Sequence, residues 1–138
     1  MKLLLLLTLL SDPLLKDYNA TLIECYDGDT CTFNIHFGLG VVLAKQTVRF
    51  CDINAPEIRP LKTRQEATKV RDNVVYLIRS ARKVQLRIPQ KRNCDDPDTC
   101  DDKGKYGRWL AYIIIDGNNL NQMLLDNGLV DEWKDKCI

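Results

Sequence analysis

The pattern of hydrophobic and polar positions along the chain predicts β-strands in five segments. The segments are rich in β-branched and aromatic residues and are separated by turns that contain Gly or Asp. They cover residues 20–26, 31–37, 46–53, 83–88 and 109–115. Three predicted strands therefore precede a long middle segment with a different period, and two follow it.

That middle segment, residues 63 to about 81, has the period of an amphipathic helix. Its apolar positions form one stripe made of Val70, Val74, Leu77, Ile78 and Ala81. Thr63 and Glu66 have the spacing of a capping box, which predicts the start of the helix at Thr63.

A second, shorter helix is predicted from about residue 119 to 127. Leu120, Met123 and Leu124 would face inward, and Gly128 would end the helix. Three strands, a helix, two strands and a closing helix indicate a mainly β fold with helices. We expect an OB-type five-stranded Greek-key barrel with two or three packed α-helices.

The length of 138 residues suits one domain, which we place at residues 19–138. Residues 1–18 would form a signal peptide or an N-terminal extension. Met1 to Leu10 is one lysine and a leucine-rich run, too short to span a bilayer but similar to the apolar part of a secretory signal. No typical cleavage site follows, so an N-terminal helix or strand packed on the domain is the alternative. A cleaved signal would make the protein secreted and leave it without a membrane segment.

Charge is distributed unevenly, although the formal net charge is only +1. Residues 59–92 hold eleven Lys and Arg against two acidic residues, whereas the segments before and after are net acidic. A basic middle with acidic flanks suits a protein that faces a polyanion and holds a cation nearby. A solvated helix face with charged strand ends would give the same pattern.

Six cysteines are more than intracellular domains of this size usually contain. Cys25 and Cys31 lie symmetrically about Gly28, so a hairpin turning there would place them opposite each other. A disulfide between Cys94 and Cys100 could close an Asp-rich loop, and the pairing of Cys51 and Cys137 is left open. Free thiols in strands are the alternative. Neither five-residue gap has the short spacing of zinc ligand pairs.

Oxygen ligands for a divalent cation occur at the ends of predicted strands. Asp29 closes a Gly-containing turn, and Asn54 ends the third strand just before Ala55. Calcium accepts carboxylates, amides and backbone carbonyls, so Asp29, Asn54 and the Ala55 carbonyl make a partial shell. Asp27 and Asp52 could support it with negative charge from outside that shell. Acidic residues are also common in turns that bind nothing.

Two arginines add the groups that bind phosphate. Arg49 lies in an otherwise uncharged predicted strand, where a charge is costly unless it faces a polar cleft or a partner. Arg108 opens a strand directly after a Gly-containing turn. Two guanidinium groups could hold a phosphodiester while charge builds on it. Pairing of each arginine with a carboxylate is the structural alternative.

Taken together, D-G-D-T at residues 27–30, R-F-C-D-I-N-A-P-E at 49–57 and K-Y-G-R-W-L-A-Y at 105–112 resemble the staphylococcal nuclease (thermonuclease-like) family over roughly residues 20–130. The resemblance implies an OB-type barrel and a calcium-dependent hydrolase of DNA and RNA, with other divalent cations as substitutes. It implies that Asp29, Asn54 and Ala55 bind the metal, that Glu57 orients or activates water, and that Arg49 and Arg108 clamp the phosphate. Lys105 and Tyr106 would contact the terminal phosphate and the sugar. A monomer without a stable protein partner is expected.

The sequence departs from the family pattern at several places. Asn54 stands where the type enzyme has aspartate, which should weaken cation binding. About six extra residues separate Thr30 from Arg49, so that residues 37–45 form a longer hairpin. The last helix of the type enzyme and its tyrosines have no counterpart, and Trp133 would either stack on bases or cap the core. Two other readings stay open: a catalytically silent nucleic-acid-binding module and a disulfide-stapled interaction domain.

Overall fold

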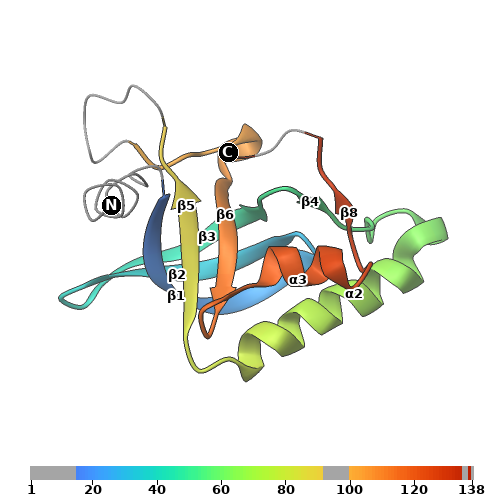
Figure 1. Cartoon of the computed structure of the whole chain (residues 1–138), viewed down its shortest axis with the longest axis horizontal. Helices are drawn as coiled ribbons and strands as arrows, with labels where there is room; N and C mark the ends of the chain where they lie inside the picture. The colour runs from blue at the N-terminus through green and yellow to red at the C-terminus, as the bar shows by residue number, and fades with distance from the viewer. Residues whose placement is uncertain (1–14, 92–99, 135–136, 138) are drawn as a thin grey trace, which may run out of the picture.

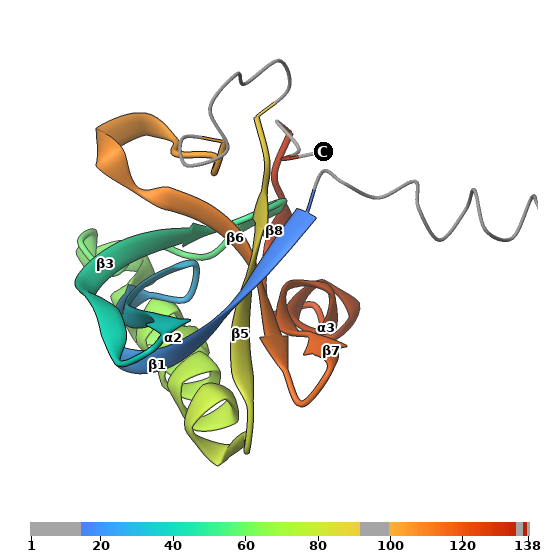
Figure 2. The same ribbon diagram turned by 90° about the vertical axis from the view of Figure 1, so that its left-hand side faces the viewer.

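A closed five-stranded barrel forms the body of the protein in a computed structural model that describes residues 15–91, 100–134 and 137. The strands are β1 (Leu15–Asp27), β2 (Thr30–Gly38), β3 (Val41–Phe50), β5 (Val84–Pro89) and β6 (Trp109–Ile115). All neighbours pair antiparallel except β3 and β6, whose parallel pairing closes the barrel (Figures 1 and 2). The predicted OB-type barrel with helices is confirmed.

Short elements complete the chain. β4 (Ile53–Asn54) pairs with β8 (Asp131–Glu132), and β7 (Asn118–Asn119) pairs with the end of β6. A single 3-10 turn, η2 (Lys105–Gly107), precedes β6. In both views the helices α2 (Leu61–Ser80) and α3 (Leu120–Asp126) lie on the same side of the barrel, and the β2–β3 hairpin projects from it (Figures 1 and 2).

The barrel interior is apolar and closely packed, because alternate residues of every strand point inward. Phe33, Val48, Leu86 and Ile113 are fully buried there. The predicted stripe of the long helix is also confirmed, with Val70, Val74 and Ile78 buried and Leu77 and Ala81 partly so. Leu120 and Leu124 of α3 are buried, Met123 packs against the core, and Gly128 has a φ of 70° directly after the helix.

Several predicted boundaries were wrong. β1 begins at Leu15, five residues earlier than expected, so that Leu15–Tyr18 belongs to the barrel. The third predicted strand is interrupted at Cys51–Asp52, where Asp52 adopts a φ of 66° and the backbone turns. The secretory-signal prediction falls on residues 1–14, outside the described part. No helix of the described residues is long and apolar enough to cross a bilayer.

The capping box was also wrong. α2 begins at Leu61 after Pro60, which makes no side-chain cap. Thr63 therefore lies inside the first turn, where its hydroxyl donates to the carbonyl of Glu57 at 2.6 Å. The physical reason is that Pro60, with its fixed φ, starts the helix before Thr63 is reached. The bond instead ties α2 to the segment that carries Glu57.

Two disulfides are described. Cys25 and Cys31 are opposite each other in the β1–β2 ladder and are bonded, as the hairpin symmetry predicted. Cys51 and Cys137, whose pairing the sequence left open, are also bonded. Cys100 is disulfide-bonded as well, whereas its predicted partner Cys94 lies outside the described residues. One disulfide thus joins the neighbouring strands β1 and β2, and the other joins the residue after β3 to Cys137.

Candidate active site

The β1–β2 turn places two carboxylates beneath a cleft. A side chain at Gly28 would lie 2.7 Å from Val70 of α2 and 3.0 Å from Ala55, so only glycine fits this close approach. Asp27 and Asp29, on either side of it, are both buried. The Asp29 backbone N–H donates to Asp27 at 3.3 Å, which fixes one carboxylate against the other.

Asp29 is the most connected residue of the turn. One carboxylate oxygen accepts from the Thr30 hydroxyl at 3.0 Å, and the other accepts from the Ala55 backbone N–H at 2.7 Å. The second oxygen also lies 3.4 Å from Nη2 of Arg49. These bonds join the turn, the end of β3 and the segment after β4.

Arg49 is the last residue but one of β3, and it pairs with Thr30 of β2. Its guanidinium is mostly buried, and it donates from Nη1 to the Phe50 carbonyl at 2.9 Å. The ring of Trp133 lies against it, 5.5 Å from the guanidinium carbon to the ring centroid. A partner carboxylate and an aromatic face offset the cost of burying this charge.

A cleft of about 560 Å³ opens above the turn. It is lined by Tyr26, Asp27, Thr30, Glu57, Arg59, Tyr106 and Arg108. Glu57 is exposed, and the Arg108 guanidinium lies 5.4 Å from the centre of the Tyr106 ring. The structure therefore brings together four residues that the sequence placed in the site: Asp27, Glu57, Tyr106 and Arg108.

Arg108 also lines a second cleft, of about 300 Å³, which contains Arg49 and Trp133. Burial lowers the pKa of Arg49, and the nearby positive charge of Arg108 lowers it further. Arg49 is thus paired with a carboxylate, as the structural alternative expected, and it also borders a cleft that Arg108 lines. Binding of phosphate by the two arginines stays a prediction.

Asn54 does not line the cleft that contains Asp27. It is exposed and lines a third cleft, of about 430 Å³, which also contains Glu57 and Asp131. Ala55 lines the same cleft but is buried, and its N–H is bound by Asp29. In the described part of the chain, no group of three or more His, Cys, Asp or Glu side chains is placed to hold a metal ion.

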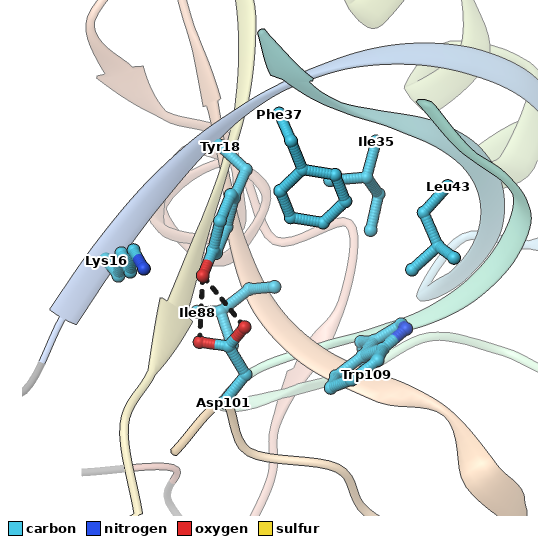
Figure 3. A pocket seen from close by; sticks show the side chains of 8 residues that line it. All are labelled: Lys16, Tyr18, Ile35, Phe37, Leu43, Ile88, Asp101 and Trp109. Atoms are coloured by element: carbon cyan, nitrogen blue, oxygen red, sulfur yellow. Dashed lines mark hydrogen bonds between the residues drawn. The ribbon is translucent and has the colours of Figure 1, made fainter. Parts of the chain in front are cut away.

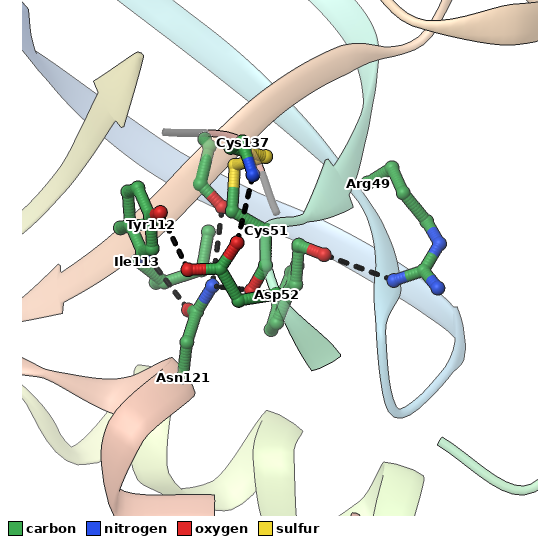
Figure 4. Close-up of a disulfide and its surroundings, with 9 residues drawn as sticks. Arg49, Cys51, Asp52, Tyr112, Ile113, Asn121 and Cys137 are labelled. Atoms are coloured by element: carbon green, nitrogen blue, oxygen red, sulfur yellow. Dashed lines mark hydrogen bonds between the residues drawn. A yellow bond between two sulfur atoms is a disulfide. The ribbon is translucent and has the colours of Figure 1, made fainter. Parts of the chain in front are cut away.

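The carboxylate of Asp52 is hydrogen-bonded to the C-terminal segment (Figure 4). Its two oxygens accept from the Tyr112 hydroxyl at 2.6 Å and from the Cys137 backbone N–H at 2.8 Å. It lines the cleft of Arg49 and not the clefts of Asp27 or Asn54. Lys105 begins the turn η2, and its side chain lies outside what the structure describes.

Burial and the neighbouring Asp29 raise the pKa of Asp27 to about 7, burial being the larger cause. The Asp29 N–H and the charge of Arg49 act in the opposite direction but do not offset it. Two adjacent buried carboxylates with one guanidinium beside them favour an added positive charge. A proton supplies it near neutral pH, and a cation would compete for the same place.

Sequence reasoning did not assign Tyr26, Thr30 or Arg59 to the cleft, and it left Trp133 undecided between stacking and capping. Arg59 was visible as the first residue of the basic segment, two positions after Glu57. Trp133 and Arg49 are in contact but far apart in the chain, so no local sequence pattern predicts the contact. That contact depends on the return of the C-terminal segment to β4.

An OB-type barrel thus carries a buried Asp29–Arg49 pair, and Arg108 lines both the cleft of Arg49 and the cleft of Glu57. Residues 47–136 match the family model described as staphylococcal nuclease homologue, and the chain belongs to that family. It is also 31% identical over 119 residues to Endonuclease YncB of Bacillus subtilis (strain 168). The alignment covers 83% of this chain and 47% of that relative, so the chain spans about half of its length.

Proposed function

We propose that the protein is a calcium-dependent nuclease that hydrolyses phosphodiester bonds of DNA, RNA or both with low sequence specificity. The observation that carries this proposal is the common cleft of Arg108 and Glu57 above the Asp29–Arg49 ion pair. Membership of the family and the likeness to a relative named as an endonuclease support it.

The oxygen donors present fit a hard cation. Asp29, Asn54 and the Ala55 carbonyl would hold calcium, with Asp27 supplying negative charge beside them and water completing the shell. The raised pKa of Asp27 is consistent with a place where positive charge is favoured. When bound, the cation would neutralise charge on the phosphate oxygens. The single amide, Asn54, makes the expected affinity lower than that of an all-carboxylate shell.

The protein's own residues would divide the remaining work. Arg108 and the guanidinium of Arg49 would bind the non-bridging phosphate oxygens and stabilise the charge that grows on them. The carboxylate of Glu57, exposed at the cleft, would orient a water molecule and accept its proton as the water oxygen attacks phosphorus. The bond from phosphorus to the leaving oxygen then breaks, in line with the attack.

Weak sequence specificity follows from the character of the cleft. Tyr106 and Tyr26 offer ring faces on which any base can stack, and Arg59 with Arg108 can contact the backbone. Stacking and phosphate contacts do not distinguish bases, whereas base-edge hydrogen bonds would. The protein should therefore act on many sequences, and the proposal includes that it does so as a monomer. Its disulfides agree with a secreted location, which we include in the proposal.

A calcium titration of cleavage tests this function. Purified protein should cleave single-stranded oligonucleotides when calcium is added, and EDTA should stop cleavage. Glu57→Gln should lower kcat by roughly a hundredfold or more because proton transfer is lost. Glu24→Gln, an exposed change on β1 away from the clefts, is the matched control.

The position of Asn54 favours one second candidate, a silent nucleic-acid-binding module, because the metal ligands are not gathered in one cleft. Oligonucleotide binding in EDTA without any turnover after calcium addition would establish that candidate. Turnover that Glu57→Gln leaves unchanged would instead overturn the role given to Glu57.

A further inference from the structure

A separate cavity of about 280 Å³ opens where β1 begins, at the opposite end of that strand from the Asp27–Thr30 turn. Its lining combines aromatic rings with charged groups (Figure 3). The side chains that matter are Lys16, Tyr18, Phe37, Leu43, Asp101 and Trp109. None of these has a place in the proposed catalytic chemistry.

Three aromatic rings from three strands surround the cavity. Tyr18 of β1 and Phe37 of β2 meet edge to face at 5.4 Å between ring centroids. Trp109 of β6 is held in place by a bond from its indole N–H to Gln46 at 2.9 Å. Phe37 is 51% exposed, so its ring is presented at the cavity mouth and not enclosed in the core. Tyr18 itself is buried, so the rings of Phe37 and Trp109 are the ones that suit the flat face of a nucleobase.

One carboxylate is held at the base of the cavity. Asp101 accepts the Tyr18 hydroxyl at 3.0 and 2.8 Å on its two oxygens and the Gln90 amide at 2.6 Å. Burial and Asp101 both raise the pKa of Tyr18, so its hydroxyl stays a donor across the ordinary pH range. Each carboxylate oxygen has two lone pairs, which leaves acceptor capacity for an N–H group of a base.

Lys16, which lines the cavity, and Lys103, which lies over the ring of Trp109, favour a negatively charged ligand. Nζ of Lys16 lies 5.3 Å from the centre of the Tyr18 ring, and Nζ of Lys103 lies 4.5 Å from that of Trp109. Cations already occupy positions over these two rings, which disfavours a cationic ligand. A phosphate attached to a stacked base would instead meet both lysines favourably.

The cavity shares a wall with the proposed active site. Trp109 directly follows Arg108, and Lys103 pairs with Trp109 in an isolated bridge. Asp101 lines the cavity, whereas its neighbour Asp102 lines the cleft of Arg49. A single strand that leaves Arg108 can therefore cross the segment 103–109 and reach Trp109.

We propose that this cavity is a second nucleobase subsite, in which a base distant from the cleaved bond stacks on Phe37 and Trp109 while its phosphates meet Lys16 and Lys103. The identity of the ligand as a nucleic-acid strand rests on the proposed nuclease function, whereas the geometry of the cavity does not. It gives the protein a preference for longer strands, because a dinucleotide at Arg108 cannot also fill the cavity.

The test compares Phe37→Ala with Leu39→Ala on a thymidine octanucleotide and a dinucleotide. Both residues are exposed on the β2–β3 hairpin, but of the two only Phe37 lines the cavity. We expect Phe37→Ala to raise KM for the octanucleotide by about tenfold, with kcat and the dinucleotide unaffected. Equal behaviour of the two variants would overturn the subsite. An abasic octanucleotide of equal charge should show no difference between wild type and Phe37→Ala; a difference would assign the effect to the backbone and overturn it too.

If the protein cleaves neither substrate, the proposed function fails and binding still decides this inference. Trp133→Phe leaves Trp109 as the single tryptophan. In EDTA, the octanucleotide should quench its fluorescence more than the abasic strand does. Equal or absent quenching would overturn the subsite independently of catalysis.

Discussion

At the scale of single residues, the informative positions are those where a charge is buried. Asp27 and Asp29 lie side by side with one arginine beside them, and the pKa of Asp27 is raised to about 7. The protein thus carries an unfavourable carboxylate at the centre of its site. Such a cost in stability is typical of sites built to receive a cation or to develop charge.

Asp27→Asn should stabilise the protein, and the gain should depend on pH. The folded carboxyl keeps its proton up to about pH 7, whereas the unfolded one loses it near the ordinary pKa of 3.8. The folded state binds more protons between these values, so wild-type stability falls as pH rises through that window. Relative to wild type, the variant should gain little near pH 4 and on the order of 1–2 kcal/mol above pH 7. Thermal melting in EDTA at several pH values measures this, and a constant gain would contradict it.

Asn54→Asp should tighten calcium binding. The substitution restores the carboxylate of the family pattern, beside Glu57 and Asp131 in the third cleft. One added negative charge near a divalent ion should lower the calcium concentration for half-maximal cleavage by roughly tenfold. Asn118→Asp, an exposed change at the start of β7, is the control for net charge. An equal shift in both variants would remove Asn54 from the metal shell.

At the scale of elements, Asn119 and Asn121, at the start of α3, have different structural roles. Asn119 is the helix N-cap, and its side chain accepts from the Gln122 N–H at 3.1 Å. Asn121 is buried, donates to the carbonyl of Cys51 at 2.8 Å and accepts from the Ile113 N–H at 3.0 Å (Figure 4). It thereby supplies hydrogen bonds where β3 ends and no ladder continues.

Asn121→Ala should therefore cost about 2–4 kcal/mol, because it leaves buried backbone groups unpaired. Asn119→Ala should cost about 1 kcal/mol, as for an ordinary exposed cap. Chemical denaturation of both variants gives the comparison directly. Similar losses at the two positions would show that Asn121 acts only as a helix residue.

The elements also show what the sequence could and could not reveal. The hydrophobic pattern predicted the barrel strands and the stripe of α2 because these elements bury their apolar residues in the core. The break after Phe50 was missed, since apolar residues continue to Ile53 while Asp52 turns the backbone. Asn121 was invisible for a different reason: its partners are supplied by strands that only the folded barrel brings to it.

At the scale of the whole molecule, the C-terminal segment completes the site. Trp133 donates its backbone N–H to Asp52 at 2.8 Å, β8 pairs with β4, and Cys137 is bonded to Cys51. These contacts hold the Trp133 ring against Arg49. The motifs of the sequence predicted residues of the candidate site, but the position of the C-terminal segment is set by contacts between residues some 85 positions apart.

The double variant Cys51→Ala/Cys137→Ala should lower both stability and activity. Loss of a disulfide that closes a loop of 86 residues should cost about 3–5 kcal/mol. KM should rise as Trp133 and Arg49 lose their fixed position. Cys25→Ala/Cys31→Ala, which opens a loop of only 6 residues, should cost less and leave KM unchanged. Equal KM values for the two double variants would contradict a role of the C-terminal segment in the site.

The Cys51–Cys137 bond has a consequence for the cell that makes the protein. A newly synthesised copy in reducing surroundings would hold these two sulfurs as thiols and would lack the closure at Arg49. We expect the proposed nuclease activity of such a copy to be low, and to reach its full value only after the two thiols are oxidised to the disulfide. The same covalent link that steadies the fold would then protect the producer's own genome and transcripts.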